Sequence, residues 1–308
     1  ISKLFDFNSD SVFYHNFPPS YMAGILNQFI VPLLNCSKIA IGDRFGALSA
    51  LTFWEKPMRF SVNKFFMSPT MLSLILSLDR KRVGKKYLED KNATIITATA
   101  PLSVDLRHKF ENTFGIKLFE SFGLTETLFN ASNCPNTPVI DSCAGYILDG
   151  VVPEIAEDGE LIIYCDWMFI RYFTEPDNTR HTFFATGDIA EIMEDNSLFI
   201  IGRKKDLIIK GGMNISPARI EKELAPLLSE KNIEYSVVGI HDTVMGEKIV
   251  LAYVYNQELN NKKEINAALV KALGNEYKID EFIMIDKIPV NSLGKIMKRE
   301  IKKSIEKM

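Results

Sequence analysis

Short apolar runs that alternate with helical patterns most restrict the fold of this 308-residue chain. The runs at 65–67 and 93–97 are too short for helices and suit buried strands. Between them, residues 71–76 repeat apolar side chains at helical spacing, and residues 116–122 return as a strand. This alternation predicts an α/β layer over about residues 1–130.

The pattern of apolar residues along the chain changes twice after this layer. Residues 131–204 contain several short apolar strands and no pattern for a long helix, which predicts a β-rich subdomain. Residues 205–308 return to mixed elements, with Ser216 suited to cap a helix. We therefore expect a large N-terminal domain over residues 1–204 and a small, mobile α+β C-terminal domain over 205–308.

The composition excludes several functional classes. Hydrophobic residues make up 46% of the chain and charged residues 24%, with a net charge of −3, which gives no electrostatic reason to expect nucleic acid as a partner. No run approaches the roughly 18 apolar residues that a membrane span needs. The four cysteines are scattered without a Cys-x-x-Cys pair, which favours a reducing, cytoplasmic location and no zinc site.

A carboxylate and a guanidinium are predicted to face each other across a hairpin. A symmetric turn centred between Asp195 and Asn196 would pair Met193 with Leu198, and would place Asp188 opposite Arg203, roughly 5 Å apart at Cβ. Such a pair can accept from and donate to the two hydroxyls of a ribose. The alternative is a surface salt bridge without a ligand.

A second candidate site follows the strand at 116–122 and reads Ser121, Phe122, Gly123, Leu124, Thr125 and Glu126. Loops at the carboxyl ends of strands are where α/β folds hold ligands. Phe122 could stack on a base, Thr125 could reach a phosphate oxygen, and Glu126 could hold Mg²⁺. The alternative is a glycine turn with a capping threonine.

A third candidate is the polar loop 291–295, which ends in Lys295. A mobile lysine is a compact positive charge that suits a developing phosphate anion. In isolation, such a residue is far more often a solvated surface lysine.

Seven segments in this order resemble the adenylate-forming superfamily, the AMP-dependent synthetases and ligases that include acyl-CoA and aryl-CoA synthetases. The resemblance covers nearly the whole chain, and its segments are 98–102 (Ala-Thr-Ala-Pro-Leu), 122–126 (Phe-Gly-Leu-Thr-Glu), 159–161 (Gly-Glu-Leu), 186–188 (Thr-Gly-Asp), 202–206 (Gly-Arg-Lys-Lys-Asp), 211–212 (Gly-Gly) and 291–295 (Asn-Ser-Leu-Gly-Lys).

The resemblance implies an ATP/AMP site. Phe122 matches the aromatic residue that packs on adenine, within Ser121–Leu124 and helped by Ala98, Thr99, Ala100 and Pro101. Asp188 and Arg203 match the ribose-binding pair.

The same resemblance implies the catalytic groups. Thr125 matches a phosphate contact and Glu126 a Mg²⁺ ligand. Lys295 matches the lysine that bridges the substrate carboxylate and the α-phosphate.

Other matches concern the acid and the acyl acceptor. Tyr21, with Ser20, matches a gating aromatic beside the acyl pocket. Lys205 matches the hinge of the C-terminal domain, and Gly211 and Gly212 lie where CoA-using members pass the pantetheine arm.

The implied reaction is ATP-dependent activation of a carboxylic acid to its acyl-AMP, with release of pyrophosphate, followed by transfer to CoA. Transfer to the phosphopantetheine of an acyl carrier protein, a reaction that stops at the adenylate, and a non-catalytic relative that binds nucleotide or acyl groups are the alternatives. Hydride transfer is disfavoured because no Gly-x-Gly-x-x-Gly follows a strand.

The sequence departs from the family pattern in places. No Ser/Thr/Gly-rich phosphate loop precedes Tyr21, so we expect these 308 residues alone to turn over ATP poorly. Ala98 and Thr99 stand where glycines are usual, and Arg171 stands where glycine commonly precedes Tyr172.

Overall fold

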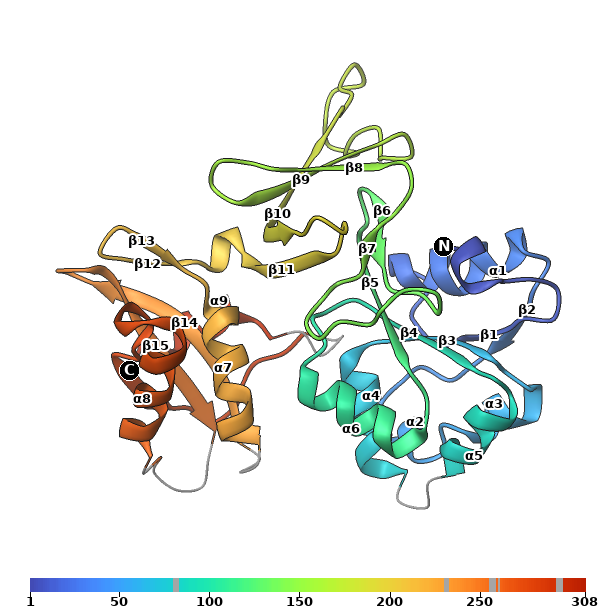
Figure 1. The fold of residues 1–308 in the computed structure, drawn as a ribbon, viewed down its shortest axis with the longest axis horizontal. Helices are drawn as coiled ribbons and strands as arrows, with labels where there is room; N and C mark the ends of the chain where they lie inside the picture. Colours follow the sequence, from blue (N-terminus) through green and yellow to red (C-terminus); the bar gives the residue numbers. More distant parts are fainter. Residues whose placement is uncertain (80–82, 230–232, 255–258, 260, 292–295) are drawn as a thin grey trace. The chain divides into compact units, whose positions relative to one another are not determined.

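The computed structural model describes residues 1–79, 83–229, 233–254, 259, 261–291 and 296–308. It has the expected α/β class, with three sheets and helices among them (Figure 1). The chain divides into two compact units. Unit 1 comprises Ile1–Glu154, Ile162–Thr186 and Ile192–Phe199, and unit 2 comprises Ile155–Leu161, Gly187–Glu191 and Ile200–Met308. The domain boundary expected after residue 204 stays a prediction.

A seven-stranded sheet organises unit 1, in the order β2-β1-β3-β4-β5-β6-β7. The first five strands in this order are parallel, and β6 and β7 are antiparallel to their neighbours. The strands are β1 (Val12–His15), β2 (Lys38–Ile41), β3 (Lys64–Met67), β4 (Thr94–Thr97), β5 (Leu118–Leu124), β6 (Leu128–Ser132) and β7 (Tyr146–Ile147).

Helices connect and cover these strands, and α4 and α6 lie side by side in Figure 1. They are η1 (Lys3–Phe5), the π-helix η2 (Ala23–Ile30), α1 (Val31–Leu34), α2 (Ala47–Leu51), α3 (Glu55–Phe60), α4 (Pro69–Leu78), α5 (Val83–Asp90) and α6 (Val104–Phe114). Apolar side chains from both layers, among them Phe65 and Phe110, are almost fully buried in one core.

Capping residues mark both ends of α6. Ser103 accepts a hydrogen bond from the backbone N–H of Leu106 (3.3 Å) at the start of α6, and Gly115 ends that helix in a left-handed conformation with φ of 69°. The strand expected at 116–122 instead runs over Leu118–Leu124, because its second half pairs with the antiparallel β6.

The middle of the chain is β-rich, as expected. A four-stranded sheet has the order β11-β10-β9-β8. Its strands are β8 (Val151–Ile155), β9 (Glu160–Cys165), β10 (Phe184–Ile192) and β11 (Leu198–Arg203).

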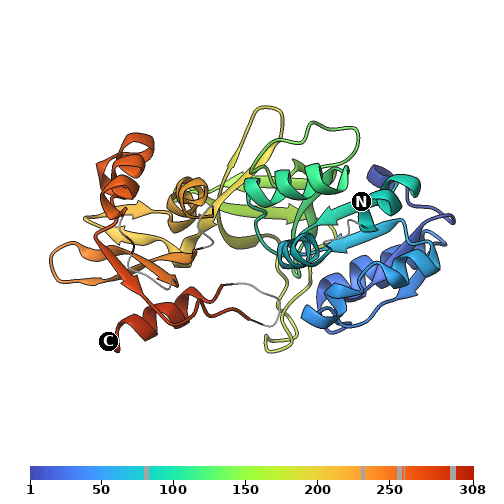
Figure 2. The same cartoon turned by 90° about the horizontal axis from the view of Figure 1, so that it is seen from below.

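The rest of unit 2 is a five-stranded sheet in the order β13-β12-β15-β14, with β16 beside β15. Ile301 and Ile305 bury one face of the last helix, α9, which is dark red beside the C-terminus in Figure 2. The elements are η3 (Lys204–Asp206), β12 (Ile208–Lys210), β13 (Met213–Ile215), α7 (Pro217–Ser229), β14 (Glu234–Asp242), β15 (Gly246–Val254), α8 (Lys262–Leu273), η4 (Asn275–Tyr277), β16 (Glu281–Met284) and α9 (Lys298–Ile305).

Among the described residues, no helix combines the length and apolar character that crossing a membrane requires. All four cysteines are free.

Candidate functional site

Three of the predicted segments meet at one edge of the unit 1 sheet. Residues 16–21 follow β1, residues 98–102 follow β4, and residues 121–126 make up the end of β5 and the turn after it. Since these strands are parallel, their carboxyl ends lie at the same edge, where α/β folds form ligand sites. The structure therefore gathers the candidate acyl and adenine segments within one unit.

The loop with Ser20 and Tyr21 is fixed by a buried glutamine that sequence reasoning missed. Gln28 of η2 accepts hydrogen bonds from the backbone N–H groups of Asn16 (3.0 Å) and Phe17 (2.9 Å). Its amide group donates to the carbonyl of Phe66 in β3 (3.2 Å). Tyr21 then packs against the core, half-buried. A polar residue inside an apolar helical stretch was the signal in the sequence.

The segment Ala98–Pro101 keeps a glycine-like backbone. Thr99 has φ of 82°, in the left-handed region that β-branched residues rarely occupy. The backbone N–H of Ala98 donates to the carbonyl of Met67 (3.2 Å), which joins the segment to the end of β3. The threonine thus adopts a conformation that glycine tolerates better, at the cost of local strain.

Gly123 is required by a close approach of two strands. A Cβ atom at this position would lie 1.9 Å from the carbonyl oxygen of Leu128 in β6. The register of β5 and β6 also shifts between Phe122 and Gly123, which indicates a bulge that bends the strand. Residues 125–127 then form the turn, with Thr125 exposed and Glu126 half-buried.

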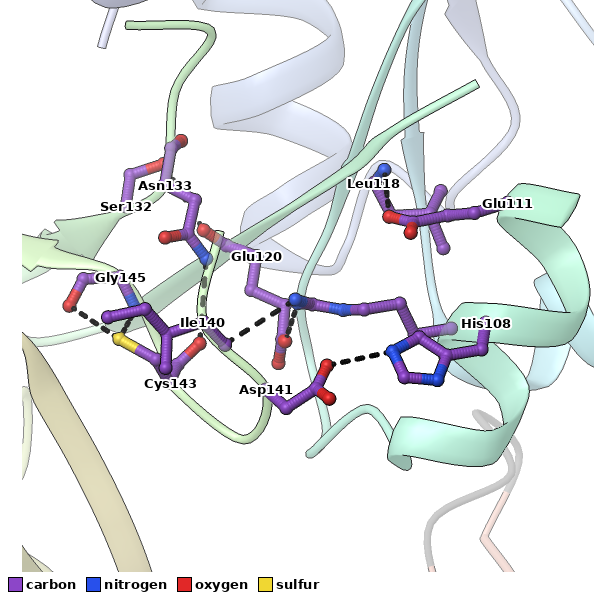
Figure 3. A network of polar contacts seen from close by, with 11 residues as sticks. His108, Glu111, Leu118, Glu120, Ser132, Asn133, Ile140, Asp141, Cys143 and Gly145 are labelled. Atoms are coloured by element: carbon purple, nitrogen blue, oxygen red, sulfur yellow. Dashed lines mark hydrogen bonds and ion pairs between the residues drawn. The ribbon is translucent and has the colours of Figure 1, made fainter. Parts of the chain in front are cut away.

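A buried ion pair fixes the strand that carries this turn (Figure 3). Glu120 of β5 pairs with Arg107 of α6, whose side chain is only 3% exposed. The Glu120 carboxylate also accepts a hydrogen bond from the backbone of Leu102. Burial raises the pKa of Glu120 to about 7, against the lowering effect of Arg107. One carboxylate thus ties segment 98–102 to the strand that leads into 121–126.

Glu126 fits a metal ion that a bound nucleotide also holds. Within the part of the chain that the structure describes, no group of three His, Cys, Asp or Glu residues could hold a metal. Mg²⁺ commonly takes one or two carboxylates and completes its coordination with substrate phosphates and water. Glu126 makes no ion pair with any described residue and accepts a hydrogen bond from the Tyr172 hydroxyl, so its carboxylate fits that role.

Unit 2 contains the predicted carboxylate–guanidinium pair. The Nε atom of Arg203 lies 2.8 Å from Oδ1 of Asp188, whose side chain is 4% exposed. The hairpin register that led to this prediction was wrong by one residue. Met193 donates to the carbonyl of Ser197 (3.0 Å) instead of pairing with Leu198.

The error has a local cause. Asn196 has φ of 64°, and a left-handed residue after a turn inserts a one-residue bulge into a hairpin. The long arginine side chain still reaches Asp188.

Glu160, from the Gly-Glu-Leu segment, contacts the residue before Asp188 and the residue after Arg203. Its Oε1 accepts from the backbone N–H of Gly187 (2.9 Å), next to Asp188. Its Oε2 accepts from Nζ of Lys204 (2.6 Å), next to Arg203. Glu160 therefore links β9 to β10 and to Lys204, which directly follows β11.

Gly211 and Gly212 have a local structural role. They form the two-residue turn between β12 and β13, with φ of 58° and 81°, as this tight hairpin turn requires. Lys205 is exposed within η3. Neither observation tests the roles proposed for these residues toward CoA and domain movement.

Lys295 lies outside the described residues. Val290 and Ile296 form an isolated β-bridge outside the strands, and the backbone N–H of Met297 donates to the carbonyl of Pro289 (2.9 Å).

The family model described as AMP-binding enzyme matches residues 1–167 of the chain. This match agrees with the order of the motifs and with the fold. The chain belongs to the AMP-binding enzyme family. Its curated relatives include a sulfoacetate–CoA ligase of Cupriavidus necator, 28% identical over 92% of this chain and 57% of the relative. A malonate–CoA ligase of Arabidopsis thaliana is 24% identical over 99% of this chain and 56% of the relative.

Solved structures share the fold. ATP-bound MatB from Rhodopseudomonas palustris matches with a TM-score of 0.84 at 23% identity, covering 99% of this chain and 62% of that protein. The chain spans little more than half the length of the curated relatives named above.

Proposed function

We propose that this protein activates a carboxylic acid with ATP, forming an acyl-AMP and pyrophosphate, and then transfers the acyl group to CoA. The observation that carries the proposal is the Asp188–Arg203 pair (2.8 Å) in a member of the AMP-binding family. In this proposal the pair binds the two ribose hydroxyls, and Phe122, beside segment 98–101, packs on the adenine.

The first step requires alignment and charge neutralisation more than proton transfer. A carboxylic acid is an anion at neutral pH, so its oxygen attacks the α-phosphorus without a general base, and the bond to pyrophosphate breaks. In the proposal Lys295 bridges the carboxylate and the α-phosphate, and Thr125 contacts a phosphate oxygen. Mg²⁺, when held by Glu126 and the phosphates, neutralises phosphate charge.

The second step exchanges AMP for a thiol. The sulfur of CoA attacks the acyl carbon, the bond to the phosphate oxygen breaks, and AMP leaves with the electron pair. The Gly211–Gly212 turn is proposed to pass the pantetheine arm, and Lys205 to act as the hinge between the two steps. Tyr21 and Ser20 are proposed to border the acid. The cysteine usage supports a reducing cytoplasm as the location.

The test supplies the protein with ATP, Mg²⁺, CoA and one acid from a panel that spans sulfoacetate, malonate, succinylbenzoate and long-chain acids. We expect acid-dependent AMP together with acyl-CoA, both measured by mass spectrometry. The rate of this 308-residue chain is expected to be low, because its sequence lacks a recognisable phosphate loop.

Two other results are informative. Acyl-AMP without acyl-CoA would favour a carrier protein as the acceptor, or a reaction that ends at the adenylate. Absence of acid-dependent AMP with every acid, although ATP binds, would contradict the proposal and favour a non-catalytic relative.

A further inference from the structure

The turn with Glu126 is held by a segment that lies more than forty residues later in unit 1. The hydroxyl of Tyr172 donates a hydrogen bond to Oε1 of Glu126 (2.9 Å, 46 residues apart). From this contact we infer that Tyr172 is a positioning residue that orients the Glu126 carboxylate toward the Mg²⁺ of bound ATP. The inference rests on the proposed function, in which Glu126 is the metal ligand.

The same segment also fixes the backbone of the turn. The N–H of Phe169 donates to the carbonyl of Glu126 (2.8 Å), and Nε1 of Trp167 donates to the carbonyl of Thr127 (3.0 Å). Glu126 is thus held at its side chain and at its main chain by the same short stretch. Because the backbone is fixed in this way, the hydrogen bond from the Tyr172 hydroxyl sets the orientation of the Glu126 carboxylate.

Tyr172 is itself held from two sides. Its backbone N–H donates to Oε2 of Glu175 (2.7 Å), and the same carboxylate binds Nε2 of His181 (2.8 Å). The rings of Tyr172 and His181 both pack on Phe169, each with ring centroids 4.7 Å apart. Because these contacts fix the ring, the hydroxyl points in a defined direction although the residue is 43% exposed.

A tyrosine suits this role chemically. A tyrosine hydroxyl is a hydrogen-bond donor, and here it donates to Oε1 of Glu126. The hydrogen bond occupies one oxygen of the carboxylate and leaves Oε2 for a metal. Mg²⁺ demands nearly ideal geometry, and groups that orient a ligand typically change metal affinity by about 10- to 100-fold when removed.

The experiment measures metal binding without turnover. Mn²⁺ replaces Mg²⁺, and free Mn²⁺ is quantified by electron paramagnetic resonance in the presence of ATP and the 308-residue protein. We expect Tyr172→Phe to weaken Mn²⁺ binding roughly tenfold, while ATP binding measured without metal stays unchanged. The conservative change keeps the ring and its packing, so a purely structural role would leave the Mn²⁺ affinity unaltered.

Tyr164→Phe is the matched control. Its hydroxyl also donates to a glutamate, Glu154, at 2.9 Å, but on another part of unit 1. We expect this variant to bind Mn²⁺ as the wild type does. Equal weakening in both variants would overturn the inference, as would a Tyr172→Phe affinity within about twofold of the wild type.

Glu126→Gln separates the inference from the proposed function. If Glu126→Gln loses Mn²⁺ affinity and Tyr172→Phe does not, only the positioning role of Tyr172 fails. If Glu126→Gln retains the full affinity, or if the wild type retains no Mn²⁺ with ATP, the metal role in the proposed function fails, and the inference fails with it.

Discussion

At the scale of the residue, Thr99 shows a β-branched side chain held in a left-handed backbone conformation. Its φ of 82° belongs to the left-handed region, where a non-glycine residue costs of order 1–3 kcal/mol. Neighbouring contacts hold the segment in place, because Ala98 is bonded to β3 and Leu102 to Glu120. The strain therefore persists beside the proposed adenine site.

We predict that Thr99→Gly raises the free energy of unfolding by about 1 kcal/mol, since relief of strain exceeds the added entropy of the unfolded chain. Urea unfolding followed by circular dichroism measures the change. Thr52→Gly is the control, because Thr52 has φ of −113° and gains no such relief. A Thr99→Gly variant no more stable than the wild type would show that Thr99 stores no strain.

At the scale of the element, helix α6 holds strand β5 at two points. Glu111 accepts from the backbone N–H of Leu118 (2.8 Å), and Arg107 pairs with Glu120 (Figure 3). The nearby carboxylates Asp141 and Glu111 also raise the pKa of Glu120. The stability of this helix–strand contact therefore depends on whether Glu120 carries its proton.

The pKa of Glu120 rises from the ordinary value of 4.5 to about 7 in the folded protein. We predict that the free energy of unfolding of the wild type falls as the pH rises between these two values. In this window the folded carboxyl retains a proton that the unfolded chain has released, so rising pH favours unfolding. Glu120→Gln should remove this part of the pH dependence, as urea unfolding across the window would show. Glu89→Gln, which changes an exposed glutamate, should keep the pH dependence of the wild type. If Glu120→Gln also keeps it, Glu120 is not the group that causes this pH dependence.

Strands β9, β10 and β11 depend on Glu160 in a comparable way. We predict that Glu160→Gln weakens AMP binding by about 1 kcal/mol, roughly fivefold, because Gly187 and Lys204 lose their common anchor beside the Asp188–Arg203 pair. Calorimetric titration with AMP measures the loss. Asp158→Asn removes the charge of the exposed contact with Lys204 and keeps an amide oxygen that can accept from the backbone N–H of Glu160, so this variant should bind AMP normally. Equal affinities in Glu160→Gln and the wild type would contradict this role.

At the scale of the whole molecule, the predicted site residues belong to two units. The acyl and adenine segments and Glu126 lie in unit 1, whereas the Asp188–Arg203 pair and the Gly211–Gly212 turn lie in unit 2. The proposed function requires both sets to act on one nucleotide. In the proposed function Lys295 acts in adenylate formation and not in thioester formation, so the two half-reactions can be tested separately.

We predict that Lys295→Ala slows adenylate formation by about 10²–10³-fold, as expected when a group that stabilises developing charge is removed. Thioester formation from supplied acyl-adenylate should continue, because the phosphorus is no longer attacked in that step. The two half-reactions are measured separately, by pyrophosphate release and by acyl-CoA formation. An equal loss in both would contradict the role of Lys295.

Much of the fold was predictable because local signals agreed with it. Ser103 and Gly115 mark the ends of α6, and strand–helix alternation specified the α/β class. The Asp188–Arg203 pair was predicted through an incorrect register and is nonetheless present. Gln28, Glu160 and Tyr172 were not assigned roles, because their hydrogen-bond partners are distant along the chain and the local sequence does not show which residues these partners are.

The sequence by itself determined the order of the elements, the α/β class and the family to which the chain belongs, since these follow from periodicity, caps and motif spacing. Only the tertiary structure decided which side chains orient the candidate groups. The hydrogen bond from Tyr172 to Glu126 and the pair of Arg107 with Glu120 arise when separate segments pack together. Burial, which raises the pKa of Glu120, likewise exists only in the folded chain, because water is excluded there.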